Sequence, residues 1–361
     1  MKSTHQSRSR SKTSKDELRN YEPDWVLLRE LVDAYGVSGN EEEVRDLIKK
    51  KIKHHVSKVG NDKYGSLICE ESCEKHKEKI MIVAHMDEVG LIVKHVSDKG
   101  SISFAPIGGI DPLALVGHRV LIRSKVPVSG VITTVYLSDG EQTLELPVME
   151  DLYIDTGLST EELESVGVKP GVFINLSPNE SIINNRTIIG KALDDRIGCF
   201  ILLEVARLLS KTESSVIYVF SVQEEVGLYG AATSSYKIKP DKAIAIDVTQ
   251  ENSRSELSTK YLGKGPTITV KDAALISNET IIQELEEAAE KNKISYQVDV
   301  SELGTTDATA IATSRTGVPT GVLGVAVRNI HSTMSIAHLD DIKNAIKLLY
   351  HLLRKKHAGK N

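Results

Sequence analysis

The chain has 361 residues, of which 40% are hydrophobic and 26% are charged, and its formal net charge is −5. This composition is typical of a globular protein, and the length allows one large core or two domains of usual size. The chain has no run of about 18 apolar residues, which excludes a membrane-spanning helix, and its acidic balance disfavours nucleic-acid binding as the main task.

The chain begins with a polar, basic tail, which we assign to residues 1–22. Its first 15 residues contain no acid and no apolar stretch of the kind found in a secretory signal, but they do contain Lys2, Arg8, Arg10, Lys12 and Lys15. We interpret the tail as a disordered, solubilising extension, with an arm that binds nucleic acid or a protein partner as the alternative. Without an export signal, we expect a cytoplasmic protein with no membrane partner.

Cysteine usage agrees with a reducing compartment. The chain has three cysteines, Cys69, Cys73 and Cys199, and this odd, low number argues against a disulfide framework. Cys69, Cys73 and His76 have a spacing loosely like that of a zinc site, but a fourth ligand is missing. We therefore interpret them as ordinary surface-loop or strand-edge residues.

Two helices and a buried strand are predicted before residue 89. Apolar residues recur at helical intervals in Trp25–Tyr35 and in Glu41–His55. Ser38 precedes Glu41 at the spacing of a capping box, which predicts the start of the second helix. The short apolar run Lys79–Ala84 is typical of a buried strand.

The pattern of apolar residues changes in residues 89–173. Their apolar runs, such as Val120–Ile122 and Val131–Val135, are short, rich in β-branched residues and separated by Gly, Pro, Ser and Asp. This pattern predicts a small antiparallel β domain.

After Gly190 strands and helices alternate. The predicted elements are the helix Ile197–Leu209, the strands Val216–Val222 and Ala243–Ile246, the helix Thr280–Lys291, the strand Val322–Val327 and the helix Leu339–Lys355. Such alternation predicts an α/β fold with a mostly parallel sheet covered by helices. Residues 23–88 and 174–361 would form this α/β domain, with the small β domain of residues 89–173 inserted into it.

Histidines and carboxylates gather where these strands end. In chain order they are His85, Asp87, Asp194, Asp195, Glu224, Glu225, Asp247 and His331. Each one alone could be a helix cap or a hydrogen-bonded core residue. Together they are hard to explain in that way, because ligands of α/β sheets bind beyond the carboxyl ends of strands and clustered carboxylates repel one another without a cation.

The residue types indicate divalent metals. Two histidines with several carboxylates suit zinc, cobalt or manganese, and a bridging carboxylate holds two cations about 3.5–4 Å apart in two-metal hydrolases. In the pair Glu224 and Glu225, one side chain can bind metal while its neighbour stays free to take a proton from a metal-activated water.

Several motifs resemble the M42 family of metallopeptidases, which are tetrahedral aminopeptidases that include glutamyl and deblocking aminopeptidases. The matching stretches follow in family order and cover nearly everything after about residue 24; they are Tyr35–Arg45, Ala84–Gly90, Gly190–Arg196, Val222–Gly227, Ile246–Thr249, Gly304–Ala308 and Arg328–His331. The resemblance implies a zinc-peptidase-like fold and a dinuclear aminopeptidase that removes N-terminal residues from short peptides.

The resemblance also implies a role for each residue. One metal would be held by Asp194, Glu225 and His331, and the other by His85, Asp194 and Asp247. Asp194 would bridge the two ions, which would be zinc or cobalt, with manganese as an alternative. Glu224 would be the general base, and Asp87 would orient His85. The insert would be the family's dimerisation domain, and the chain would form dimers and a hollow dodecamer.

Three other functions stay open at this point. The same metal-activated water would serve a deacylase of small N-acyl compounds, and related proteins have been described as endoglucanases. The third alternative is a non-catalytic paralogue that kept the fold, against which the presence of Glu224 and of every expected ligand argues.

Overall fold

The computed structural model describes Leu18 and residues 21–71, 78–134, 146–176, 181–209, 215–251 and 259–355. Nearly all of the predicted tail lies outside the described residues, as do Cys73 and His76 of the loose zinc-like pattern. Cys69 is buried in a strand of the core. Within the described part of the chain, no helix combines the length and the apolar character needed to cross a membrane.

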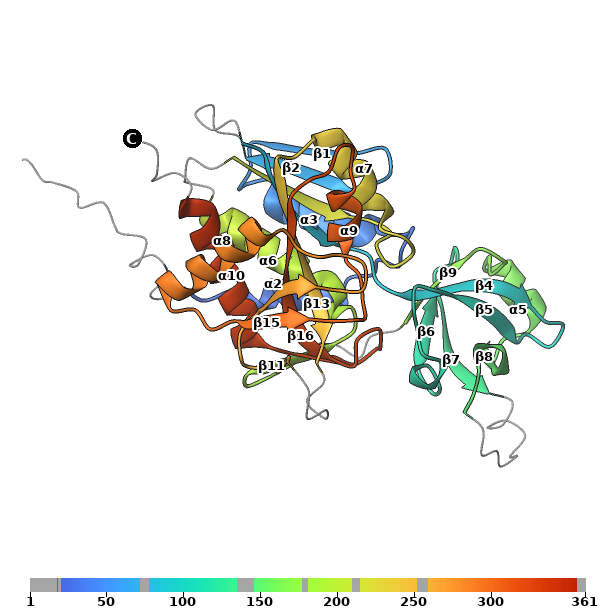
Figure 1. Ribbon diagram of the computed structural model, residues 1–361. Helices are drawn as coiled ribbons and strands as arrows, with labels where there is room; N and C mark the ends of the chain where they lie inside the picture. Colours follow the sequence, from blue (N-terminus) through green and yellow to red (C-terminus); the bar gives the residue numbers. More distant parts are fainter. Residues whose placement is uncertain are drawn as a thin grey trace, which may run out of the picture.

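The body of the protein is built on an 11-stranded sheet (Figure 1). The strands follow across the sheet in the order β1 (Lys58–Asn61), β2 (Leu67–Glu71), β12 (Val216–Ser221), β3 (Ile80–His85), β13 (Lys242–Gln250), β16 (Thr320–Arg328), β17 (Ser335–His338), β11 (Thr187–Gly190) and β10 (Ile182–Asn184). A branch beside β16 consists of β14 (Thr267–Lys271) and β15 (Gln297–Val300).

The sheet is parallel at its centre and antiparallel towards its edges. Strands β12, β3, β13 and β16 run parallel, whereas the pairings of β1 with β2, β2 with β12, and β10, β11, β17 and β16 in series are antiparallel. The predicted α/β class with an inserted β domain is confirmed. The sheet is more mixed than the predicted mostly parallel one, because hairpins extend both of its edges.

Helices cover both faces of the sheet. One face carries α2 (Trp25–Asp33), α3 (Glu42–Ile52), α6 (Leu193–Leu209), α8 (Glu279–Asn292) and α10 (Leu339–Lys355), and the other carries α7 (Tyr229–Ile238) and α9 (Asp307–Ala312). The alternation of side chains along β3 explains the two cores. Ile80, Ile82 and Ala84 belong to the first core, whereas Met81 and Val83 belong to the second.

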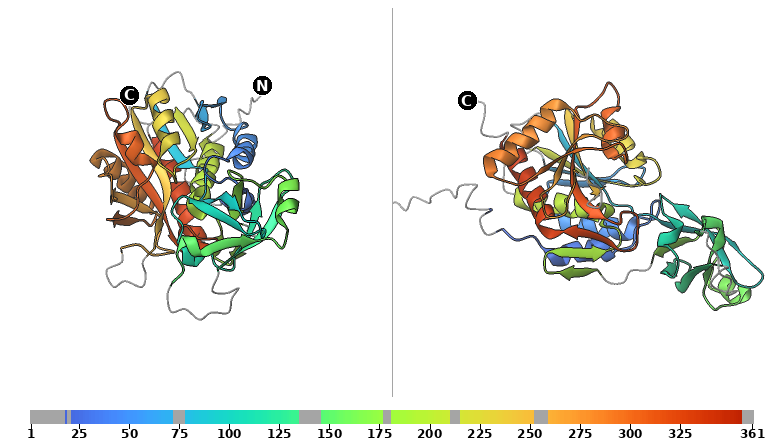
Figure 2. Two further views of the ribbon diagram at one scale, coloured as in Figure 1. Left: turned by 90° about the vertical axis from the view of Figure 1, so that its right-hand side faces the viewer. Right: turned by 60° about the horizontal axis from the view of Figure 1, so that its bottom comes forward.

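The insert is a closed barrel that projects from the body (Figures 1 and 2). Its strands are β4 (Gly90–Val96), β5 (Ile102–Ile107), β8 (Leu152–Asp155), β7 (Val128–Thr134), β6 (Arg119–Ile122) and β9 (Phe173–Leu176), and its short helices are η1 (Pro112–Ala114), η2 (Met149–Asp151) and α5 (Thr160–Ser165). All of its strand pairs are antiparallel, and it has an apolar core of its own. Closure gives every barrel strand two neighbours.

A buried ion cluster ties the layers together beneath the site described below. This anchor cluster consists of Glu88, Lys191 and Arg196. The Lys191 ammonium lies 2.8 and 2.7 Å from the two carboxylate oxygens of Glu88, and the Arg196 guanidinium lies 3.4 Å from the same carboxylate. Arg196 also donates to the carbonyls of Leu31, Ala34 and Met86, so it joins the end of α2 to the end of β3.

Two local predictions were wrong. Ser38 does not cap α3, because its hydroxyl donates to Asp87 across the core, and the N-cap residue of α3 is Glu41 without a side-chain cap bond. Asp247 does not end its strand, because the ladder of β13 with β16 continues as far as Gln250 opposite Val327. In both cases a long-range contact replaces the local pattern.

Candidate active site

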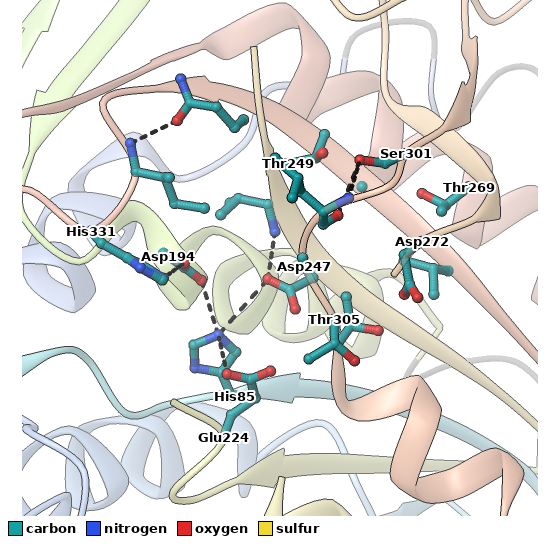
Figure 3. A pocket seen from close by; sticks show the side chains of 18 of the residues that line it. His85, Asp194, Glu224, Asp247, Thr249, Thr269, Asp272, Ser301, Thr305 and His331 are labelled. Carbon is teal, nitrogen blue, oxygen red and sulfur yellow. Dashed lines mark hydrogen bonds and ion pairs between the residues drawn. The ribbon is translucent and has the colours of Figure 1, made fainter. Parts of the chain in front are cut away.

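The predicted site residues converge at one end of the parallel strands. His85 is the last residue of β3, Asp247 lies within β13, and the pair Glu224 and Glu225 follows β12. His331 follows β16 in a left-handed backbone conformation (φ 57°). With Asp194 they line a cavity of about 620 Å³ (Figure 3).

Asp194 connects the two histidines. Its Oδ1 lies 2.9 Å from His85 Nε2 and its Oδ2 lies 3.1 Å from His331 Nε2. Asp194 precedes the regular part of α6, because it and Asp195 have non-helical backbone angles. One carboxylate therefore faces both histidine nitrogens, which is the geometry expected of a ligand shared by two cations.

Each histidine has a further carboxylate beside it. Asp247 Oδ1 lies 3.8 Å from His85 Nε2, and Glu225 Oε2 lies 3.3 Å from His331 Nε2. Glu224 Oε2 is 4.0 Å from His85 Nε2. Glu225 thus lies on the His331 side of Asp194, whereas Glu224 lies on the His85 side, so the neighbouring glutamates occupy different positions.

Asp87 stands behind His85 and fixes the turn after β12. It is fully buried, and its Oδ1 lies 3.5 Å from His85 Nδ1. Its carboxylate accepts the backbone N–H groups of Glu224 and Glu225 at 3.0 and 3.3 Å and the Ser38 hydroxyl at 2.6 Å. The backbone carbonyl of Asp87 lies closer still, 3.2 Å from His85 Nδ1, so Asp87 orients the ring through both groups while its carboxylate positions both glutamates.

Asp195 is a member of the group that the sequence left without a role. It is fully buried, its Oδ1 accepts the N–H of Gly198 at 2.9 Å, and its Oδ2 has no partner within the described residues. Ligand atoms of His85, Asp195 and Asp247 lie within 4.8 Å of one another, as do those of His85, Asp194 and Glu225. We refer to His85, Asp194, Asp195, Glu224, Glu225, Asp247 and His331 as the site cluster.

The pKa shifts show that this cluster holds too many negative charges for its surroundings. Burial and the charge of Asp194 raise the pKa of Glu225 to about 8. Burial and neighbouring carboxylates also raise the pKa of Glu224 and Asp247 well above their ordinary values. Burial lowers the pKa of His331, but Asp194 and Glu225 outweigh it and raise that pKa to about 9. These shifts favour the protonated carboxyl groups, and a bound cation would compete with those protons for the same oxygens.

The donor set fits divalent metal ions. Oδ2 of Asp195 and Oε1 of Glu225 are buried and accept no hydrogen bond from any described residue. Buried carboxylate oxygens without a donor are costly unless a cation pairs with them. Imidazole nitrogens mixed with carboxylate oxygens are the ligands that zinc, cobalt and manganese accept.

The barrel supplies part of the wall of this site. Gly108 has a left-handed backbone (φ 81°), and a Cβ placed there would lie 3.3 Å from Cβ of Glu225 and 2.7 Å from Val89. A Cβ on Gly109 would lie 3.5 Å from Nδ1 of His331. The insert therefore touches the site cluster through a pair of residues that have no side chains.

Comparisons with known proteins agree on one family. The model of the family described as M42 glutamyl aminopeptidase matches residues 65–348. A lysyl aminopeptidase of Pyrococcus furiosus is 33% identical, with 92% of this chain and 97% of the relative covered.

Solved structures give the same result. An aminopeptidase of the archaeon Desulfurococcus kamchatkensis superposes with a TM-score of 0.87 at 35% identity, covering 91% of this chain and 94% of its own. The TET1 peptidase of Pyrococcus horikoshii, described as assembling into a tetrahedron or a large octahedral shell, gives a TM-score of 0.82 at 33% identity, covering 91% and 98%.

Proposed function

Because this chain belongs to the M42 family of aminopeptidases, we propose that it is a two-metal enzyme that removes N-terminal residues from short peptides. The observation that carries the proposal is the position of Asp194, whose two oxygens face His85 and His331 with a further carboxylate beside each histidine. This arrangement offers two neighbouring sets of ligands that share one residue.

The same residues would hold the metals as the family resemblance implies, with one addition. His85, Asp194 and Asp247 would hold one ion, and Asp194, Glu225 and His331 the other. Asp195 lies close enough to His85 and Asp247 to support the first set. When bound, such ions polarise a scissile carbonyl and lower the pKa of a water molecule to about 7.

Glu224 is the general base of the proposed mechanism. It takes a proton from the attacking water and delivers it to the amine that leaves. Glu224 suits both steps by its position, because it lines the cavity with its Oε2 4.0 Å from His85 Nε2 and it belongs to neither proposed ligand set. Asp87 holds the N–H groups of Glu224 and Glu225, so it positions the base and a ligand together.

The proposal is tested by hydrolysis of an aminoacyl-anilide panel with metal-stripped protein, before and after zinc, cobalt or manganese is added. We expect metal-dependent release of aniline from free aminoacyl substrates. N-acetylated aminoacyl-anilides and a panel of N-acyl amino acids are the controls. Preferred cleavage of the acyl compounds would favour a deacylase, and full metal loading without turnover of either panel would favour a non-catalytic paralogue.

We further propose that the barrel mediates self-association. Apolar side chains exposed on it include Leu113, Val126, Val131 and Val148. Exposed apolar positions grouped on one small domain favour contact with another copy. Replacing Val126 and Val131 together by Glu should lower the particle mass in light scattering while dipeptide hydrolysis continues. An unchanged mass with an altered preference for peptide length would make the barrel a lid instead.

A further inference from the structure

The cavity extends beyond the site cluster into a second polar region. We call it the acidic chamber and define it by Thr249, Lys260, Thr269, Asp272 and Asp299, all of which line the same cavity. Figure 3 shows Thr249, Thr269 and Asp272 on the side of Asp247 away from His331. The chamber is built by β13 and by the branch strands β14 and β15, with Asp272 directly after β14 and Asp299 within β15.

Both acids of the chamber are buried, and each has one oxygen held and one oxygen without a donor. Asp272 is 5% exposed and Asp299 is 2% exposed. Oδ1 of Asp272 accepts the N–H groups of Ala274 and Leu275 at 2.8 and 2.6 Å, and Oδ2 of Asp299 accepts the Lys260 ammonium at 3.2 Å. Oδ2 of Asp272 and Oδ1 of Asp299 accept no hydrogen bond from the described residues.

The charges of the described side chains that define the chamber do not cancel. Among the described residues that line the cavity, Lys260 is the one with a permanent positive charge, and its ammonium is engaged by Asp299 and by the Thr249 hydroxyl at 2.9 Å. Among the side chains that line the chamber, Asp272 and Asp299 therefore outnumber Lys260 by one charge. The nearby Lys271 ammonium is not among the lining groups, and within the described part of the chain it donates to the carbonyl oxygens of Asp272 and Ser301 and not to either carboxylate. Metal ions in the site cluster would neutralise the acids there, but the chamber acids belong to neither proposed ligand set.

We propose that this chamber binds the side chain of the substrate's N-terminal residue and selects a cationic one, lysine or arginine. This inference rests on the proposed aminopeptidase function. An ammonium or guanidinium group supplies the missing charge and has enough N–H groups to donate to both free oxygens. Asp272 and Asp299 are thus specificity-determining residues.

Other side chains fit the chamber less well. A glutamate would place a third carboxylate beside the two free oxygens, and like charges in a buried site repel strongly. A leucine would bury those oxygens without giving them a donor, which is the main source of discrimination in sites built to hydrogen-bond their substrate.

The test compares lysyl- with norleucyl-anilide, because the two side chains have similar length and differ in the terminal charge. With metal-loaded protein, we expect kcat/KM for the lysyl substrate to exceed that for the norleucyl substrate by about 10²-fold, with glutamyl-anilide the poorest. Norleucyl- or glutamyl-anilide cleaved as well as lysyl-anilide would overturn the proposal.

The variants Asp272→Asn and Asp299→Asn sharpen the test. Each should lower the lysyl-to-norleucyl ratio by about tenfold or more. The matched control is Glu302→Gln, which removes the same charge from an exposed neighbour of the chamber and should leave the ratio at the wild-type value. An equal loss for both substrates in Asp272→Asn and Asp299→Asn would assign the acids to the substrate's α-ammonium group and would contradict the proposal.

A binding measurement separates this inference from the proposed function. Calorimetry with metal-loaded protein should give tighter binding of L-lysinamide than of L-norleucinamide whether or not turnover occurs. Lysinamide preference without hydrolysis of any anilide would leave the chamber assignment standing and reject the enzyme. Hydrolysis with equal binding of the two amides would do the reverse.

Discussion

The site cluster and the anchor cluster are buried groups of charged residues that share two short segments of the chain, yet they are organised in opposite ways. Residues 85–88 and 191–196 contribute to both. In the anchor cluster every charge faces a partner: Arg196 donates to the carbonyls of Leu31, Ala34 and Met86, and Lys191 also donates to that of Ala34. In the site cluster carboxylates outnumber cations, and oxygens of Asp195 and Glu225 lack a donor. Complete pairing marks a structural role, and incomplete pairing marks the place where a ligand is required.

The largest expected effect is on turnover. Glu224→Gln keeps the shape of the side chain but removes its ability to accept a proton, so kcat should fall by about 10²–10⁴-fold or more while both metals stay bound. Activity assays combined with elemental analysis check this result. Near-normal activity would show that Glu224 is not the base. Metal loss would place Glu224 among the ligands and would contradict the separate roles of Glu224 as base and Glu225 as ligand.

Removing one carboxylate from each cluster should have opposite effects on the stability of the metal-free protein. Glu88→Gln leaves Lys191 and Arg196 facing a neutral group, and breaking a buried ion pair costs about 3–5 kcal/mol of the free energy of unfolding. Asp247→Asn removes repulsion from the site cluster and should raise the melting temperature. Denaturant and thermal unfolding of both variants measure the two effects. Destabilisation by Asp247→Asn as large as that by Glu88→Gln would contradict the comparison.

Metal content should distinguish a shared ligand from an unshared one. Asp194→Ala removes a ligand from both proposed ion positions, so both ions should be lost or weakened together. His85→Ala should mainly empty one position. Elemental analysis after dialysis at a fixed free-metal concentration gives the stoichiometry, and equal, near-full occupancy in both variants would reject the bridging role of Asp194.

The pH dependence of stability gives the smallest expected effect. The pKa of Glu225 is raised to about 8 in the folded protein, whereas its ordinary value is 4.5. Between these two pH values the carboxyl loses its proton more readily in the unfolded chain than in the folded one, so a rise in pH favours unfolding. His331, with a folded-state pKa of about 9, stabilises the fold below pH 6.5, and this contribution is lost as the pH rises through 9.

Both residues therefore make the metal-free protein less stable as the pH rises from about 5 to 9, by roughly 5 °C or more in melting temperature. Bound metal should flatten this slope, because it replaces the protons. Calorimetric scans across this pH range, with and without zinc, measure both slopes. A metal-free protein whose melting temperature rises from pH 5 to pH 9 would contradict the shifts assigned to Glu225 and His331.

The site could be predicted from the sequence where its residues directly follow a recognisable strand. His85 and Asp87 stand directly after an apolar run, so the end of β3 and its chemistry were visible together. The sequence placed Asp247 correctly beside a strand but wrongly at its end. A carboxylate that faces a cavity from the middle of β13 interrupts the apolar run and so resembles the end of a strand in the sequence.

The chamber acids were not visible in the sequence at all. Asp272 follows β14 and Asp299 lies in β15, and nothing local distinguishes either from an ordinary surface acid. Their burial depends on how the branch strands fold beside β16 to cover the cavity. The prediction that Ser38 caps α3 was wrong for the same reason, since its partner Asp87 is 49 residues away in the sequence.

The wall formed by Gly108 and Gly109 limits how the protein can be recombined. A barrel with its own closed sheet and its own core looks like a module that could be exchanged between relatives or deleted. It is not one, because any side chain at Gly108 would meet Glu225 and Val89, and one at Gly109 would lie against the ring of His331. A chimaera that joins the barrel of one relative to the body of another must therefore inherit this pair of glycines and the angle at which the barrel leaves the body. The seam between the two units lies inside the proposed catalytic machinery.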